Sequence, residues 1–118
     1  MSILEASSFV VADWTDDGSR PGSAIAPLHV HHSDDEAWLV ITGRLGFQVG
    51  DEQREVGAGD GLVVPAGTPH SYWNAVAEPS RYVLVMTPRI HALIQALHAG
   101  SRADFERIFS EHDSQLLA

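Results

Sequence analysis

The sequence predicts an all-β domain, built as an antiparallel sandwich or barrel and followed by a C-terminal helical tail. Short β-prone segments alternate with Gly, Pro and Asp turn signals at intervals of about 8 to 12 residues. Leu45, Phe47 and Val49 repeat with a period of two, which is typical of a half-buried strand. After Thr87 the apolar residues change to a helical period. The length of 118 residues predicts a single domain over residues 1–118.

The expected strands follow from these patterns in chain order. We expect them over residues 7–14, 36–41, 45–49, 62–64, 70–74 and 81–86, and the small, apolar segment 22–27 leads into a histidine cluster. Asp, Gly, Ser and Pro predict turns at 16–18, 33–35, 50–52 and 65–67. The barrel core is therefore expected over about residues 7–87 and the helical tail over about residues 88–118.

The tail shows the signals of two helices. Thr87 is a good N-cap, and Pro88 suits the first helical position. Apolar residues then recur at i, i+3, i+4 and i+7 up to Gly100: Ile90, Leu93, Ile94 and Leu97. Ser101 with Asp104 forms a weaker capping pair before a second short helix.

Composition excludes several chemistries. The chain has 16 acidic residues against seven basic ones, all Arg, for a net charge of −9, and it has no Cys. Without Lys or Cys there is no Schiff base, disulfide, thiolate metal ligand or cysteine nucleophile. An acidic chain without a basic run does not favour a nucleic acid or an anionic membrane as partner. No apolar run approaches the roughly 20 residues of a membrane helix and no secretory leader is visible, so we expect a cytoplasmic protein.

Three histidines and one glutamate have the spacing of a metal site. His29 and His31 are two residues apart, so on a strand both imidazoles share one face. A hairpin after the turn at 33–35 would return the Glu36 carboxylate to that face, and His70 lies on a later strand. Three neutral imidazoles and a carboxylate suit one divalent transition metal per chain: Fe, Mn, Ni, Co, Cu or Zn.

The same residues stand in two spaced motifs. Gly22, six residues, His29-Val30-His31, four residues, Glu36, six residues and Gly43 resembles the first motif of the cupin superfamily, with one residue more than usual between Gly22 and His29. Gly59, five residues, Pro65-Ala66-Gly67, two residues, His70, three residues and Asn74 resembles the second. The 15 residues between the motifs are similar to the short spacing of small microbial single-domain cupins.

This resemblance implies a small β-barrel, a double-stranded β-helix or jelly roll, with a metal bound inside through His29, His31, Glu36 and His70. The tail is also loosely similar to that of quercetin-dioxygenase-like cupins. The first functional hypothesis is therefore a dioxygenase-like oxidoreductase acting on a small molecule. The alternatives are a Lewis-acid isomerase or polyketide cyclase, and a non-catalytic cupin that binds a small molecule such as a sugar.

Strand parity adds further expectations. If Glu36 and His70 face inward, so do Trp38, Val40, Tyr72 and Asn74, and we expect Glu36 and Tyr72 to be the catalytic groups. Asn74 is interpreted as a residue whose side chain holds a turn or the backbone in place. The opposite face of strand 36–41 is also apolar, which predicts a homodimer. The remaining polar groups of interest are interpreted as solvated surface: His32, Asp34, Asp35, His91, His98 and His112.

Overall fold

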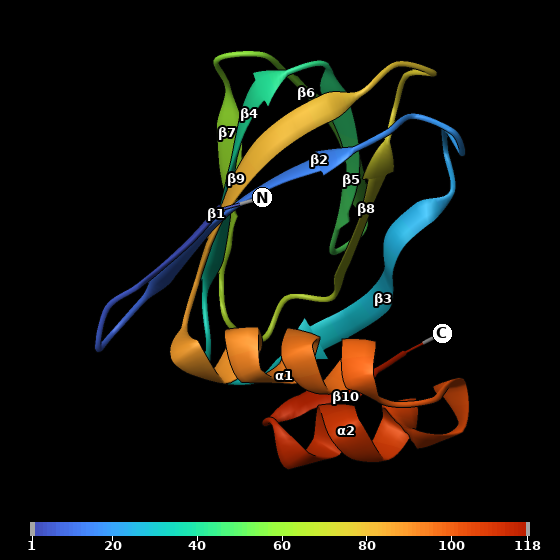
Figure 1. Ribbon diagram of the computed structural model, residues 1–118. Helices are drawn as coiled ribbons and strands as arrows, with labels where there is room; N and C mark the ends of the chain where they lie inside the picture. The colour runs from blue at the N-terminus through green and yellow to red at the C-terminus, as the bar shows by residue number, and fades with distance from the viewer. Residues whose placement is uncertain (1, 118) are drawn as a thin grey trace.

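Two five-stranded antiparallel sheets face each other as a jelly roll in the computed structural model, which describes residues 2–117 (Figure 1). The strands of the first sheet, in the order β1-β2-β9-β4-β7, are Ser2–Glu5, Val10–Asp16, Ser80–Met86, Glu36–Thr42 and Gly61–Val64. Those of the second, in the order β10-β3-β8-β5-β6, are Ser114–Leu116, Ala24–His31, His70–Asn74, Arg44–Val49 and Glu52–Gly57. The expected all-β architecture is confirmed.

The core lies between the two sheets because the inward side chains of each strand are apolar. On β4, Trp38 and Val40 are buried together with Glu36, while Leu39 on the opposite face is 46% exposed. On β5, Phe47 is fully buried and stacks on Tyr72 of β8, with ring centroids 5.7 Å apart. The period-two alternation therefore separates core from surface as expected.

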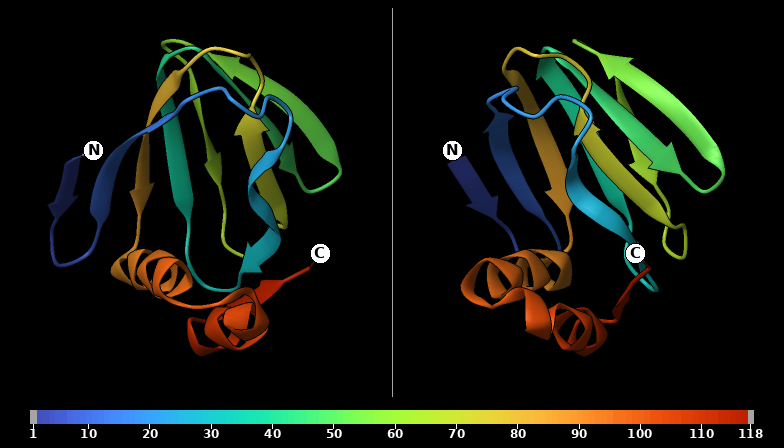
Figure 2. Two further views of the ribbon diagram at one scale, coloured as in Figure 1. Left: turned by 45° about the vertical axis from the view of Figure 1, so that its right-hand side comes forward. Right: turned by 90° about the vertical axis from the view of Figure 1, so that its right-hand side faces the viewer.

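The helical tail covers one end of the barrel (Figures 1 and 2). Helix α1 spans Pro88–Ala99, a 3₁₀ turn spans Arg102–Asp104, and helix α2 spans Phe105–Glu111. The expected N-cap is confirmed, because Ile90 N donates to Thr87 Oγ1 at 3.2 Å. No helix within residues 2–117 is long and apolar enough to cross a bilayer.

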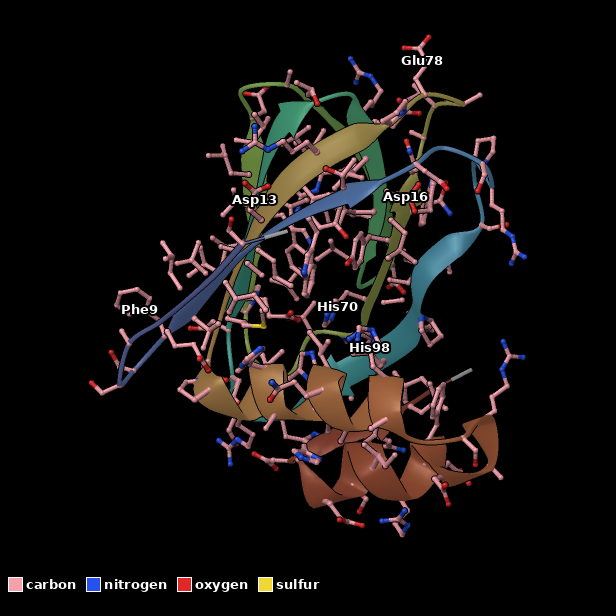
Figure 3. The ribbon with its side chains drawn as sticks, in the orientation of Figure 1. Phe9, Asp13, Asp16, His70, Glu78 and His98 are labelled. Atoms are coloured by element: carbon pink, nitrogen blue, oxygen red, sulfur yellow. The ribbon has the colours of Figure 1, made fainter. Side chains whose placement is uncertain are left out.

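Three strands lie outside the expected set: β1, β6 and β10. β1 pairs with β2 as an N-terminal hairpin, and Phe9 marks its tip (Figure 3). β10 follows α2 and pairs with the edge of β3. β1 and β10 are only three or four residues long, so neither carries a readable alternation, and each depends on hydrogen bonds to a partner strand. β6 begins within the expected turn at 50–52 and pairs with β5.

Two side chains interpreted as solvated are buried. Asp34 is 7% exposed because Arg89 of α1 reaches it, with Nε donating to Oδ2 at 2.8 Å. His91 is 5% exposed, and its Nδ1 lies 3.4 Å from Oε1 of Glu5 on β1. In both cases the partner comes from a distant part of the chain, so local sequence could not indicate it.

Hydrogen bonds of the Asn74 side chain hold the backbone together at the end of the barrel opposite the helices. Its amide nitrogen donates to Asp16 Oδ2 at 3.0 Å and to Glu78 O at 2.9 Å. Its amide oxygen accepts from Val76 N at 3.1 Å and from Ser80 Oγ at 2.9 Å. The interpretation of Asn74 as a residue that holds the backbone in place is confirmed.

Candidate metal centre

His29 and His31 lie at the end of β3 that is closest to the helices. Both are buried, at 6% and 3% exposure, and their Nε2 atoms are 3.2 Å apart. Their separation by two residues places the rings on one face of the strand, as expected. The rings meet edge to face with centroids 4.8 Å apart.

Glu36 reaches the histidines from the other sheet. The connection between β3 and β4 is not a hairpin, because β3 pairs with β8 and β10 whereas β4 pairs with β7 and β9. The expected hairpin is therefore wrong, and the chain crosses from one sheet to the other. The carboxylate then projects across the core, with Oε1 2.9 Å from His31 Nε2.

His70 completes the group from β8, the neighbour of β3. It is the cross-strand partner of His29, and its Nε2 lies 3.0 Å from Glu36 Oε1. Figure 3 shows it at the helix end of the barrel. One ligand atom from each of His29, His31, Glu36 and His70 lies within 4.8 Å of the others, so the four residues could hold a metal ion.

The second nitrogen of each imidazole has its own acceptor. Nδ1 of His29 lies 2.5 Å from Pro27 O, and Nδ1 of His70 lies 2.9 Å from Thr68 O. A carbonyl oxygen can only accept, so each Nδ1 carries a proton, and each Nε2 faces the centre of the group, where it would bind a metal once it carries no proton itself. This is the arrangement that holds histidine ligands in metal sites, and the donor set fits a divalent transition metal.

Burial and the neighbouring groups set the charge of the site. Burial is the main cause that lowers the pKa of His29 to about 4, and the nearby His70 acts in the same direction. Burial alone would raise the pKa of Glu36, but hydrogen bonds with His31 and His70 outweigh it and lower the pKa to about 2. At neutral pH the group therefore offers a neutral His29 and a charged carboxylate, the forms that bind metal.

A cavity of about 610 Å³ opens onto this group. The barrel contributes mostly aromatic and aliphatic side chains to it, among them Trp14, Ile25, Trp38, Tyr72, Tyr82 and Leu84. The helical tail contributes Ile90, Leu93, Ile94, Leu97, His98, Phe105 and Phe109. Apart from histidine, none of its lining residues is cationic. Three of the four donor residues, His29, His31 and Glu36, line the cavity, so a small molecule in contact with them would be surrounded by apolar walls.

Tyr72 lies in this cavity next to a tyrosine that the sequence reading did not single out. Its hydroxyl is 3.0 Å from that of Tyr82, and both rings are buried. Burial raises the pKa of Tyr72 well above 10 and that of Tyr82 to about 12, so both hydroxyls stay protonated at neutral pH. Since the pair shares one hydrogen bond, its second hydroxyl hydrogen is available to an acceptor in the cavity.

The other histidines lie outside the group of four donors, although one of them also lines the cavity. His32 is exposed, as expected, and His91 is buried against Glu5 of β1. His98 is exposed on α1 but also lines the cavity. The residues that sequence reasoning missed are those of the tail. Their apolar pattern was visible, but it does not say which end of the barrel they cover.

Fold and site together define a small jelly-roll protein with a buried group that could hold a metal ion. The family model for the cupin domain matches residues 19–86, which is more than half of the chain. The chain therefore belongs to the cupin family.

Individual relatives differ in their described activities. Over 46 residues the chain is 46% identical to a quercetin 2,3-dioxygenase of Bacillus subtilis, a match that covers 39% of this chain and 14% of that protein. An uncharacterized protein with a double-stranded β-helix domain from Klebsiella pneumoniae is 32% identical with a TM-score of 0.61, covering 74% of each chain. A sugar phosphate isomerase of the cupin superfamily from Silicibacter pomeroyi is 26% identical with a TM-score of 0.59, covering 69% of this chain and 51% of that one.

The lowered pKa of His29 predicts a pH-dependent stability of the metal-free protein. Unfolded His29 takes up a proton below its ordinary pKa of 6.5, whereas folded His29 does so only near 4. The free energy of unfolding therefore falls as the pH drops from 6.5 to 4, by about 3 kcal/mol from this group. Urea titrations of chelator-treated protein should show a shallower decline for His29→Gln than for the wild type. The exposed control His32→Gln should follow the wild type, and parallel wild-type and His29→Gln profiles would contradict the assignment.

Proposed function

We propose that this protein is a metal-dependent enzyme of the dioxygenase-like oxidoreductase type, acting on a small, largely apolar molecule. The observation that carries the proposal is the convergence of three imidazoles and one carboxylate, of which His29, His31 and Glu36 line a cavity of about 610 Å³. In this proposal His29, His31, Glu36 and His70 hold one divalent transition metal: Fe, Mn, Ni, Co, Cu or Zn. A metal held there would polarise a substrate or dioxygen oxygen atom.

The chain's own groups supply the rest of the chemistry. Glu36 is ionised at neutral pH, so it can accept a proton from a substrate carbon or hydroxyl as well as bind metal. Tyr72 remains protonated, so it acts as a hydrogen-bond donor and not as a base. The apolar walls exclude water around the reacting atoms, which strengthens these interactions.

The shape and chemistry of the cavity favour some substrates over others. The match to a quercetin dioxygenase supports oxidation of an apolar, oxygen-bearing molecule. A Lewis-acid isomerase or polyketide cyclase is the second candidate, because the same apolar walls would accept its substrate and no dioxygen is needed. A phosphorylated sugar is less favoured, since the cavity brings Asp16 and Glu36 but no Arg to its wall.

The metal assignment predicts the outcome of ligand removal. We expect one metal ion per chain in the wild type and none in the His29→Ala, His31→Ala, His70→Ala triple variant, measured by elemental analysis of untagged protein. His32→Ala, a control at an exposed position, should keep its metal. Metal binding to the folded state also raises the Tm, so chelation should lower it in the wild type only. Full metal occupancy in the triple variant would refute the assignment.

The catalytic assignment predicts the effect of two conservative changes. Glu36→Gln keeps the size but removes the base, so turnover should fall by roughly 10²–10⁴-fold. Tyr72→Phe removes one hydroxyl and keeps the ring, so turnover should fall roughly tenfold. Dioxygen uptake by metal-loaded protein with flavonols, dicarbonyl compounds and sugar phosphates is the measurement. Glu55→Gln, an exposed carboxylate on β6, is the control.

Turnover without dioxygen uptake would favour the isomerase or cyclase. Ligand binding with unchanged activity in both variants would favour a binding module.

We further propose that the protein is a homodimer joined through the outer face of the first sheet. The register aligns Leu4, Val11, Val85, Ala37 and Val63 as one outward row across all five strands. Leu4 is 68% exposed, Val63 58% and Val85 38%. A continuous apolar row of this length on a sheet is typical of a surface that packs on another apolar face. A second copy offers the same row.

This proposal predicts a mass of twice 12.8 kDa by light scattering at tens of micromolar protein. Placing charges in the face, as in the Leu39→Lys, Val63→Lys double variant, should give the 12.8 kDa monomer, because the four ammonium groups of two copies are costly to desolvate. Leu117→Lys, at an exposed site on the tail, should leave the mass unchanged. A monomeric wild type would overturn the proposal.

A further inference from the structure

The last strand of the tail lies beside the strand that carries two of the histidines. β10 pairs antiparallel with β3, and its register sets Ser114 opposite His31 and Leu116 opposite His29. The helices that precede β10 form part of the cavity wall, where the ring of Phe109 lies 5.4 Å from that of His29. The tail therefore contacts the candidate metal centre both through β10, beside β3, and through Phe109 of α2, beside His29.

Ser114 makes a buried hydrogen bond to one of the four donor groups. Its side chain is 4% exposed, and Oγ lies 2.7 Å from Nδ1 of His31 and 3.1 Å from the carbonyl oxygen of His112. The carbonyl can only accept, so the single hydroxyl hydrogen of Ser114 is donated to His112 O. When a metal is bound at Nε2, His31 carries its proton on Nδ1, and Ser114 Oγ is placed to accept it.

This contact differs from those of the other two imidazoles. His29 and His70 each donate Nδ1–H to a carbonyl two residues earlier in their own segment, Pro27 and Thr68. His31 has its acceptor 83 residues further along the chain. Two of the three histidines are thus oriented locally, while the third depends on the docked tail.

The backbone before Ser114 is held in an uncommon conformation. Asp113 has φ of 54°, in the left-handed region that non-glycine residues seldom adopt. His32 N donates to Asp113 O at 2.9 Å, and Arg89 lies 3.6 Å from the Asp113 carboxylate while also binding Asp34. These contacts keep the turn that directs Ser114 toward His31.

We infer that Ser114 is a positioning residue of the metal centre: it fixes the tautomer of His31, so that docking of the C-terminal strand completes the ligand set. The inference rests on the proposed metal site. It adds to that proposal a residue outside both histidine motifs, and it makes metal affinity depend on the tail.

Zinc binding and imidazole proton signals test the inference. We expect Ser114→Ala to bind Zn²⁺ about 10–100-fold more weakly in a chelator competition, the effect typical of removing such a hydrogen-bond partner. In the Zn²⁺-loaded wild type, the Nδ1–H proton of His31 should give a downfield NMR signal protected from exchange. Ser114→Ala should lose that signal and keep those of His29 and His70. Ser114→Thr, which keeps the hydroxyl, should restore both signal and affinity, and Ser110→Ala on the exposed face of α2 should match the wild type.

Amide exchange separates positioning from simple loss of the strand. Leu117 N donates to Leu28 O at 2.9 Å, so its protection reports whether β10 is docked. We expect this protection to persist in Ser114→Ala. Weaker zinc binding together with loss of that protection would overturn the inference, because the tail would then act only by covering the site. An unchanged affinity and an unchanged His31 signal would also overturn it. A wild type that takes up no zinc or other divalent transition metal would instead refute the proposed function.

Discussion

A carboxylate buried among three imidazoles is the arrangement on which the rest of the structure depends. Glu36 is 4% exposed, and an unpaired carboxylate at that depth would cost several kcal/mol. Its position is tolerable because His31 and His70 lie 2.9 and 3.0 Å from the same oxygen. That geometry needs both sheets at the correct separation, since Glu36 comes from one sheet and the histidines from the other.

The family-matched region supplies the donor groups but not the complete cavity. It covers residues 19–86, whereas Ile90, Leu93 and Phe109, which line the cavity, lie beyond it in the tail. Ser114, the partner of His31, lies beyond it as well. The barrel thus carries the four donor groups and part of the apolar lining, and the tail adds the rest of the apolar wall around the space where a ligand would lie. Differences in substrate among cupins with the same donor set are expected to arise in such added segments.

Local sequence was informative wherever a short-range rule governs the structure. The separation of His29 and His31 by two residues placed both rings on one face, because alternate side chains of a strand share a face. Parity in the same way placed Trp38 with Glu36 and Tyr72 with His70 in the core. The Thr87 cap and the apolar period after it gave the start and buried face of α1, because capping and helical periodicity are set within a few residues.

The tertiary structure decided the features that depend on segments far apart in the chain. It replaced the expected hairpin after His31 with a crossing between sheets, because hydrogen-bond partners of a strand are chosen among all strands and not by the adjoining turn. It buried Asp34 and His91 by bringing Arg89 and Glu5 to them. It also set Ser114 against His31 across 83 residues of chain. By itself the sequence indicated which four residues could meet as donors: strand parity placed His29 with His31, and the two spaced motifs that resemble those of cupins added Glu36 and His70. The closure of the site was decided only by the packing of the tail, because an apolar helix face shows that it will be buried but not against which surface.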